Sequence, residues 1–179
     1  MRPRRSILAG ALIAGSLSLV GSSSFAAPES HPIPHELQAE HARILEHLRA
    51  LSHRSNAIGT AAQHVVALLA PHDQREQEFV LPLLGVLEPL ATKGADSRMA
   101  WAIPMADRLE TEKAALYDEH AAIIGALNEL AAAGRRQHDR SVVQFAEAVA
   151  SDEVNDGSVI YPAAILVGRY IREHLPAAR

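Results

Sequence analysis

His72 and Glu76 lie four positions apart, so an imidazole and a carboxylate share one face if this segment is helical. One such pair can hold a single metal ion or help to bridge two. His41 and His120 each lie among leucines and isoleucines that recur at helical spacing. We therefore expect both of these imidazoles to point toward the interior, where they can join the pair.

The chain repeats itself at a spacing of 79 to 80 residues, which predicts a duplicated helical hairpin. Glu40-His41 matches Glu119-His120, and the sequence before Pro82 resembles the sequence before Pro162. By this repeat, His72 corresponds to Asp152 and Glu76 corresponds to Asp156. The predicted metal ligands are therefore three imidazoles and three carboxylates: His41, His72, Glu76, His120, Asp152 and Asp156. Nitrogen and hard oxygen donors without thiolate suit iron or manganese, and zinc is also compatible.

Four long amphipathic segments would position these side chains. Apolar residues recur at helical spacing over 34–56, 60–92, 97–133 and 139–175. Aromatic residues make up only 4% of the chain, which favours helices over sheets. Long helices joined by short loops predict an all-α fold, an antiparallel up-down four-helix bundle. Proline should kink or interrupt the second segment, at Pro71 and Pro82.

Residues 1–26 are typical of an export signal: arginines, then an apolar run, then small residues before a cleavage position after Ala26. The apolar run is shorter than the roughly 20 residues of a membrane span, so we expect no stable span after cleavage, with an uncleaved anchor as the alternative. Arg4 and Arg5 also resemble a twin-arginine signal, and ordinary secretion is the other route.

These features divide the chain into a signal peptide (1–26), a linker (27–33) and a bundle (34–175) in a periplasmic or secreted protein. The chain has no cysteine, which excludes disulfides, thiolate zinc sites and catalytic thiols. Its net charge is −4 and the predicted bundle has no basic block, which argues against a nucleic-acid partner. Phosphate loops, dinucleotide fingerprints and nucleophile elbows are absent from the sequence.

The ligand pattern resembles the hemerythrin-like, HHE cation-binding family. That family presents a histidine on the first helix, His-x-x-x-Glu on the second, a histidine on the third and His-x-x-x-Glu on the fourth. The resemblance covers about residues 34–175, and its matching stretches are Glu40-His41, His72 to Pro82, Glu119-His120 and Tyr161 to Gly168.

This resemblance implies a non-haem site for two irons, with an open position for dioxygen, nitric oxide or a small anion. It implies that His41, His72 and His120 are terminal ligands and that Glu76 and Asp156 are bridging carboxylates. The protein would then bind a diatomic gas, or would sense or store metal or redox state.

Asp152 departs from the family pattern, because it stands where the family has histidine. It either coordinates through a closer approach or a water, or leaves one metal position short of a ligand. Two other functions therefore stay open: a metal-free structural or interaction bundle, and a di-iron oxidase or peroxidase. Glu78 is expected to form a surface salt bridge, and Tyr161 to pack near the site as a structural residue.

Overall fold

The computed structural model describes residues 31–175, and every regular element within this range is helical. The all-α prediction is therefore confirmed for the described residues. The predicted signal peptide (1–26) and residues 27–30 of the predicted linker lie outside them. None of the helices within 31–175 is both long and apolar enough to cross a lipid bilayer.

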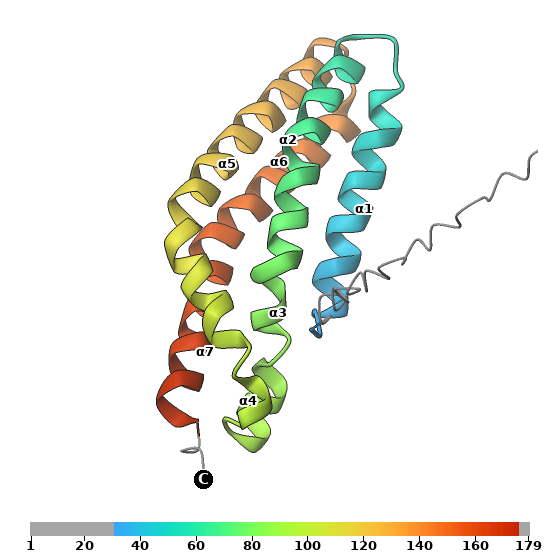
Figure 1. Cartoon of the computed structure of the whole chain (residues 1–179). Coiled ribbons are helices and arrows are strands. Elements are labelled where there is room, and N and C mark those ends of the chain that lie inside the picture. Colours follow the sequence, from blue (N-terminus) through green and yellow to red (C-terminus); the bar gives the residue numbers. More distant parts are fainter. Residues whose placement is uncertain (1–30, 176–179) are drawn as a thin grey trace, which may run out of the picture. The chain divides into compact units, whose positions relative to one another are not determined.

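The long helices lie side by side and are labelled in Figure 1. They are α1 (His35–Ser52), α2 (Ala57–Phe79), α5 (Ala102–Arg136), α6 (Arg140–Asn155) and α7 (Tyr161–His174). Shorter pieces connect them: α3 (Leu81–Leu84), α4 (Leu87–Lys93), the 3₁₀ turn η1 (Ser97–Met99) and the π-helical turn η2 (Asp156–Ile160).

The helix boundaries follow local chemistry. Asn56 caps α2 by accepting hydrogen bonds from the backbone N–H groups of Ile58 and Gly59, and Asp139 caps α6 in the same way. The second predicted segment breaks after Phe79, shortly before Pro82, as expected. At Pro71 the helix is not interrupted, because α2 continues through this residue. Packing of the buried face of α2 outweighs the one backbone hydrogen bond that a proline removes.

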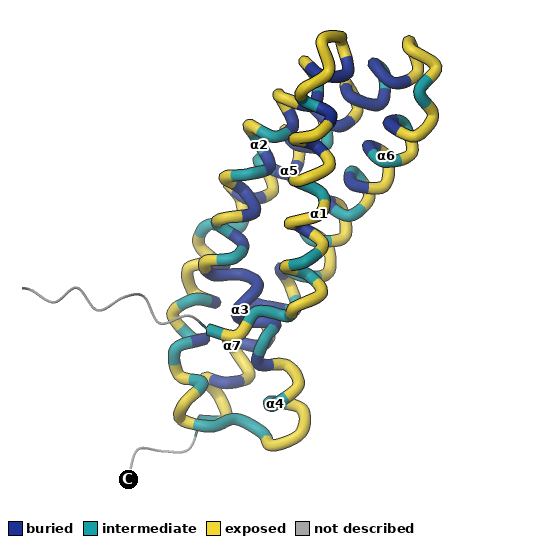
Figure 2. Tube along the Cα trace, turned by 90° about the vertical axis from the view of Figure 1, so that its right-hand side faces the viewer, coloured by how far each residue is buried: buried dark blue, intermediate teal, exposed yellow. Residues whose placement is uncertain are grey.

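Helix α5 is the centre of the packing, because it contacts α2, α6 and α7, while α1 packs mainly on α2. Buried and exposed positions alternate around each long helix (Figure 2). The buried apolar residues form two separate clusters. One includes Leu48, Leu69, Ile123 and Val149; the other includes Phe79, Leu109, Leu116 and Tyr161.

A layer of buried polar residues separates the two apolar clusters. Along α2, residues 72–76 follow Leu69 of the first cluster and precede Phe79 of the second. Along α5, His120 lies between Leu116 and Ile123 in the same way. Helices α2 and α5 thus each cross from apolar to polar to apolar surroundings, which brings side chains distant in sequence to one level.

Candidate metal centre

Within residues 31–175, all of the buried polar or charged side chains belong to this layer: His41, His72, Asp73, Glu76, His120 and Glu153. Burying charged groups is costly unless they are paired, hydrogen-bonded or bound to a metal ion. Six such groups at one level of the fold therefore identify it as the candidate functional site.

The inner group consists of His72, Glu76 and His120, which offer ligand atoms within 4.8 Å of one another. Nε2 of His72 lies 3.3 Å from Oε1 of Glu76 and 2.9 Å from Nε2 of His120. Nε2 of His120 lies 3.7 Å from the same oxygen of Glu76. The three donor atoms converge from α2 and α5 on one small volume, as they would around a single ion.

The outer group consists of His41, Glu76 and Asp156, whose ligand atoms meet the same 4.8 Å limit. Nε2 of His41 lies 3.9 Å from Oε2 of Glu76, the carboxylate oxygen that does not face the inner group. Glu76 therefore presents one oxygen to each group. A carboxylate in this position can bridge two metal ions.

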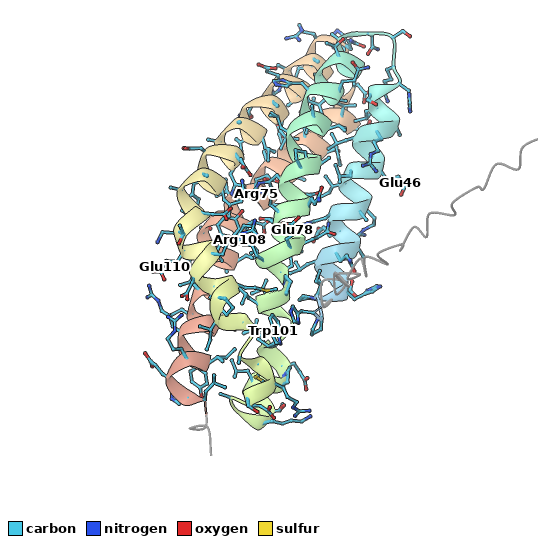
Figure 3. The ribbon with its side chains drawn as sticks, in the orientation of Figure 1. Glu46, Arg75, Glu78, Trp101, Arg108 and Glu110 are labelled. Atoms are coloured by element: carbon cyan, nitrogen blue, oxygen red, sulfur yellow. The ribbon has the colours of Figure 1, made fainter. Side chains whose placement is uncertain are left out.

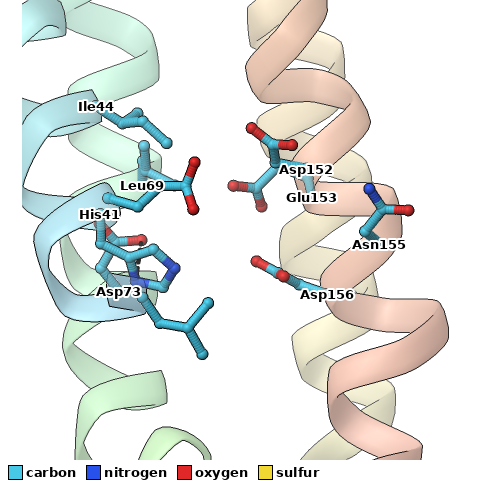
Figure 4. Close-up of a pocket in the computed structure, with 10 residues that line it drawn as sticks. His41, Ile44, Leu69, Asp73, Asp152, Glu153, Asn155 and Asp156 are labelled. Atoms are coloured by element: carbon cyan, nitrogen blue, oxygen red, sulfur yellow. Dashed lines mark ion pairs between the residues drawn. The ribbon is translucent and has the colours of Figure 1, made fainter. Parts of the chain in front are cut away.

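A pocket of about 200 Å³ opens beside the outer group. Figure 4 shows His41 and Asp73 on one wall and Asp152, Glu153 and Asp156 on the wall opposite. Its apolar lining comes from Leu37, Ile44 and Leu69. Solvent and small ligands can thus reach the outer group, whereas the inner group lies deeper between α2 and α5.

Asp152 does not take the place that the repeat predicted for it. It is only partly buried, and neither group that could hold a metal includes it. Glu153 occupies the buried position instead, with Oε2 at 3.7 Å from Nε2 of His120. The reason is helical register: Glu153 lies four residues after buried Val149, on the inward side of α6, and Asp152 lies beside that face.

Three atoms in this layer are buried without a hydrogen-bond partner: Nδ1 of His41, Oδ2 of Asp73 and Oε2 of Glu153. Each such atom costs roughly 1–3 kcal/mol, because water has been removed and nothing replaces it. Two of the three are carboxylate oxygens beside an imidazole. A cation held beside these carboxylates would offset the cost of burying them, so the imidazole and carboxylate donor set fits a metal ion.

The two groups also differ in protonation. Burial lowers the pKa of His72, but hydrogen bonds with Glu76 and Glu119 outweigh burial and raise it to about 9. Burial likewise raises the pKa of Glu76, but hydrogen bonds with His120, His72 and Tyr161 outweigh it and hold the pKa well below its ordinary range. The inner group is thus a charge-paired set.

In the outer group and the pocket, burial is the largest cause of the pKa shifts and sets their direction. It raises the pKa of Asp73 and of Asp156 to about 7 each, with repulsion from Glu76 as the next cause. It raises the pKa of Glu153 to about 8 and lowers that of His41. It also raises the pKa of Asp152, aided by Glu40. In each of these groups burial shifts the protonation equilibrium toward the uncharged form.

A second layer of contacts orients His72. Its Nδ1 lies 2.8 Å from Oε2 of Glu119, so Nδ1–H can donate there and leave Nε2 free to bind an ion. Arg75 forms ion pairs with Glu119 and Glu112. Nearby, Glu78 lies 3.5 Å from Arg108, which confirms its predicted surface salt bridge (Figure 3).

The π-helical turn η2 brings the last elements of the site together. Gly157 lies so close to α5 that an added Cβ would be 3.1 Å from Nδ1 of His120 and 3.1 Å from the Tyr117 ring. Directly after the turn comes Tyr161, whose side chain is 0% exposed and whose hydroxyl donates to Oε1 of Glu76 at 2.6 Å. Burial and the neighbouring Glu76 raise the pKa of Tyr161 far above its ordinary value.

Five of the six predicted residues therefore come together: His41, His72, Glu76, His120 and Asp156. Sequence reasoning missed Asp73, Glu153 and the hydroxyl contact of Tyr161. Asp73 and Glu153 are also related by the eighty-residue repeat, and each lies four residues after a buried apolar residue, Leu69 and Val149. These two features of the sequence could have identified Asp73 and Glu153 as inward-facing site residues.

Comparison with known proteins adds no relative. No family model matches the chain, and neither the curated proteins nor the solved structures contain a match to it. The assignment of the site therefore depends on the geometry of its own side chains.

Proposed function

We propose that this chain is an exported hemerythrin-like protein, an antiparallel up-down four-helix bundle that holds non-haem iron between its helices. The observation that carries the proposal is the shared carboxylate of Glu76, which turns one oxygen to the inner group and the other to the outer group. The proposed occupancy is two irons per chain, with manganese or zinc as alternative ions. The chain's own role is to bind dioxygen or nitric oxide, or to sense or store metal or redox state.

Iron bound in the two groups would supply an open coordination position for a diatomic ligand. The chain's own residues supply the surroundings of that position. Glu119 holds the imidazole of His72 in one orientation, and Leu37, Ile44 and Leu69 give the pocket an apolar lining. The neutral imidazole of His41 and the ionised carboxylate of Glu76 are the protonation states that metal ligation requires, whereas His72, with a pKa of about 9, must release a proton when an ion binds.

Metal analysis after purification tests the proposal. The full-length chain is expressed with abundant iron, and iron, manganese and zinc are measured per chain. Azide is then added, and the visible spectrum is followed for a ligand-to-iron charge-transfer band. We expect iron and an azide-dependent band. Absence of any bound metal after loading with each of the three ions would contradict the proposal.

A metal-free structural or interaction bundle is the second candidate. The inner group supports it, because Tyr161, Glu76, His72 and His120 satisfy one another by hydrogen bonds without an ion. In that case the melting temperature should not change on adding iron, manganese or zinc. A rise in melting temperature with any of them excludes this candidate.

A further inference from the structure

The hydroxyl group of Tyr161 lies close to all three residues of the inner group. Its hydroxyl oxygen lies 2.6 Å from Oε1 of Glu76, 2.9 Å from Nε2 of His120 and 3.5 Å from Nε2 of His72. We propose that Tyr161 is the fourth ligand of the inner ion, bound through its phenolate oxygen. This inference depends on the proposed function, because it requires that an ion binds at the inner group.

The geometry argues for ligation. With Tyr161 included, four donor atoms stand at the corners of a compact tetrahedron, two nitrogens and two oxygens. The shortest of its six edges is 2.6 Å, between Tyr161 and Glu76, and the longest is 3.7 Å, between His120 and Glu76. The centre of such a tetrahedron lies about 2 Å from each corner, which is the usual bond length of nitrogen and oxygen ligands.

The phenol oxygen is held in this position. Tyr161 is the first residue of α7, directly after η2, and its side chain is fully buried. Its ring stacks on the His120 ring, with the centroids 5.1 Å apart and the planes 28° apart. Rotation of the side chain away from the inner group would break this stacking and leave the hydroxyl in the apolar cluster around it. The oxygen is thus preorganised at the ligand position.

Charge balance supports the same role. Two neutral imidazoles and the Glu76 carboxylate offset only one of the three positive charges of ferric iron. When the ion binds, the imidazolium of His72 gives up one proton and the phenol O–H bond breaks. Both protons leave to solvent and an iron–oxygen bond forms, so that the phenolate adds a second negative charge. Uncompensated charge is costly in a buried site, and the phenolate therefore favours the ferric ion over the ferrous one.

Visible and resonance Raman spectroscopy of the ferric-loaded full-length chain test this assignment, with iron content measured on every sample. We expect a phenolate-to-iron charge-transfer band, with tyrosinate ring vibrations enhanced on excitation within it. Tyr161→Phe should abolish both while still binding iron. Tyr117→Phe is the matched control: its ring centroid lies 5.8 Å from that of Tyr161, but its hydroxyl donates to the backbone oxygen of Gly157. The control should keep the full band.

The outcomes separate the two proposals. An iron-loaded wild type without tyrosinate vibrations overturns the tyrosine assignment and leaves the proposed function intact. A band that survives in Tyr161→Phe does the same. A wild type that binds no iron overturns both. The wild-type spectrum decides even if Tyr161→Phe fails to fold.

Discussion

The inner and outer groups share Glu76 but differ in their surroundings. The atoms of the inner group are hydrogen-bonded to one another and to Tyr161 and Glu119, in a layer closed by α2 and α5. The outer group faces a pocket of about 200 Å³, and Nδ1 of its member His41 and Oδ2 of neighbouring Asp73 are buried without hydrogen-bond partners. One group is complete in the protein alone, and the other is incomplete.

This difference has an energetic consequence. The inner group can form in the folded protein before any ion binds, because its polar atoms are already satisfied. The outer group remains costly until protons or a cation neutralise its carboxylates. We therefore expect an inner ion to exchange slowly, because it lies deeper between α2 and α5, and an outer ion to exchange with solvent through the pocket.

Replacing Glu76 should have the largest effect, because both groups lose a ligand. Glu76→Gln keeps the shape of the side chain but removes its charge and one acceptor oxygen. We expect iron content close to zero. The loss of metal affinity should exceed the roughly 10–100-fold loss that follows replacement of a residue that contacts a ligand but not the metal itself. Glu78→Gln is the matched control on the same helix, since Glu78 is about half exposed and pairs with Arg108. Normal iron in Glu76→Gln would contradict the shared-ligand geometry.

Removing one histidine from each group tests whether the groups are unequal. His72→Ala should lose both irons, because Nε2 of His72 lies 3.3 Å from Glu76 and helps to position the shared carboxylate. His41→Ala should lose only the outer iron, because its nearest contact with Glu76 is 3.9 Å. Metal content per chain is the measurement, with exposed His64→Ala as the control. Equal losses in the two variants would show that the groups act as one.

The incomplete group should also make the ion-free protein sensitive to pH. The pKa of Glu153 is about 8 in the folded chain against an ordinary value of 4.5, so folding favours its protonated form. The stability that this proton contributes is complete below pH 4.5 and is lost as the pH rises through about 8. The titratable groups around Glu153 are His72, Asp73, Glu76, His120 and Asp156.

The glutamine of Glu153→Gln cannot ionise, so this variant should lose this part of the pH dependence of the unfolding free energy. After chelator treatment, we expect the variant to exceed wild type in unfolding free energy by roughly 1–3 kcal/mol at alkaline pH, and to match it at acidic pH. Urea unfolding at several pH values measures both. Glu147→Gln, on the exposed side of the same helix, should change stability by less than about 0.5 kcal/mol. A gain that does not grow with pH would rule out ionisation of Glu153 as the cause.

Helical periodicity predicted the first residues of α1, α2 and α6 to within a few positions, because the two apolar clusters and the layer between them impose an inward face on these helices. The fourth segment, expected as one helix over 139–175, is instead divided into α6 and α7 by η2. The same pattern placed His41, His72, Glu76 and His120 in the layer. It could not choose between Asp152 and Glu153, because adjacent residues differ by about 100° around a helix and either could face inward. The repeat indicated Asp152. In the structure, buried Val149 and buried Gly157 lie four residues before and after Glu153, so it is Glu153 that faces inward.

The contact of Tyr161 with the inner group was harder to predict. Tyr161 follows Asp156 by five residues across η2, and a regular helix would rotate the two side chains apart. Asn155, Gly157 and Ser158 are weak helix formers, which favours an irregular turn here but does not specify its geometry. The close approach of Gly157 to His120 depends on tertiary packing that no local pattern encodes.

The smallest expected effect is that of Asp152→Asn, which tests the register directly. Asp152 lines the pocket but belongs to neither group, so the variant should keep its full iron content, with affinity within about threefold of wild type. Asp156→Asn, one helical turn further along, should lose the outer iron. Isothermal titration with ferrous ion under anaerobic conditions compares the two affinities. If Asp152→Asn lost as much iron as Asp156→Asn, the eighty-residue repeat would predict the ligands of the fourth segment better than the buried face of α6 does.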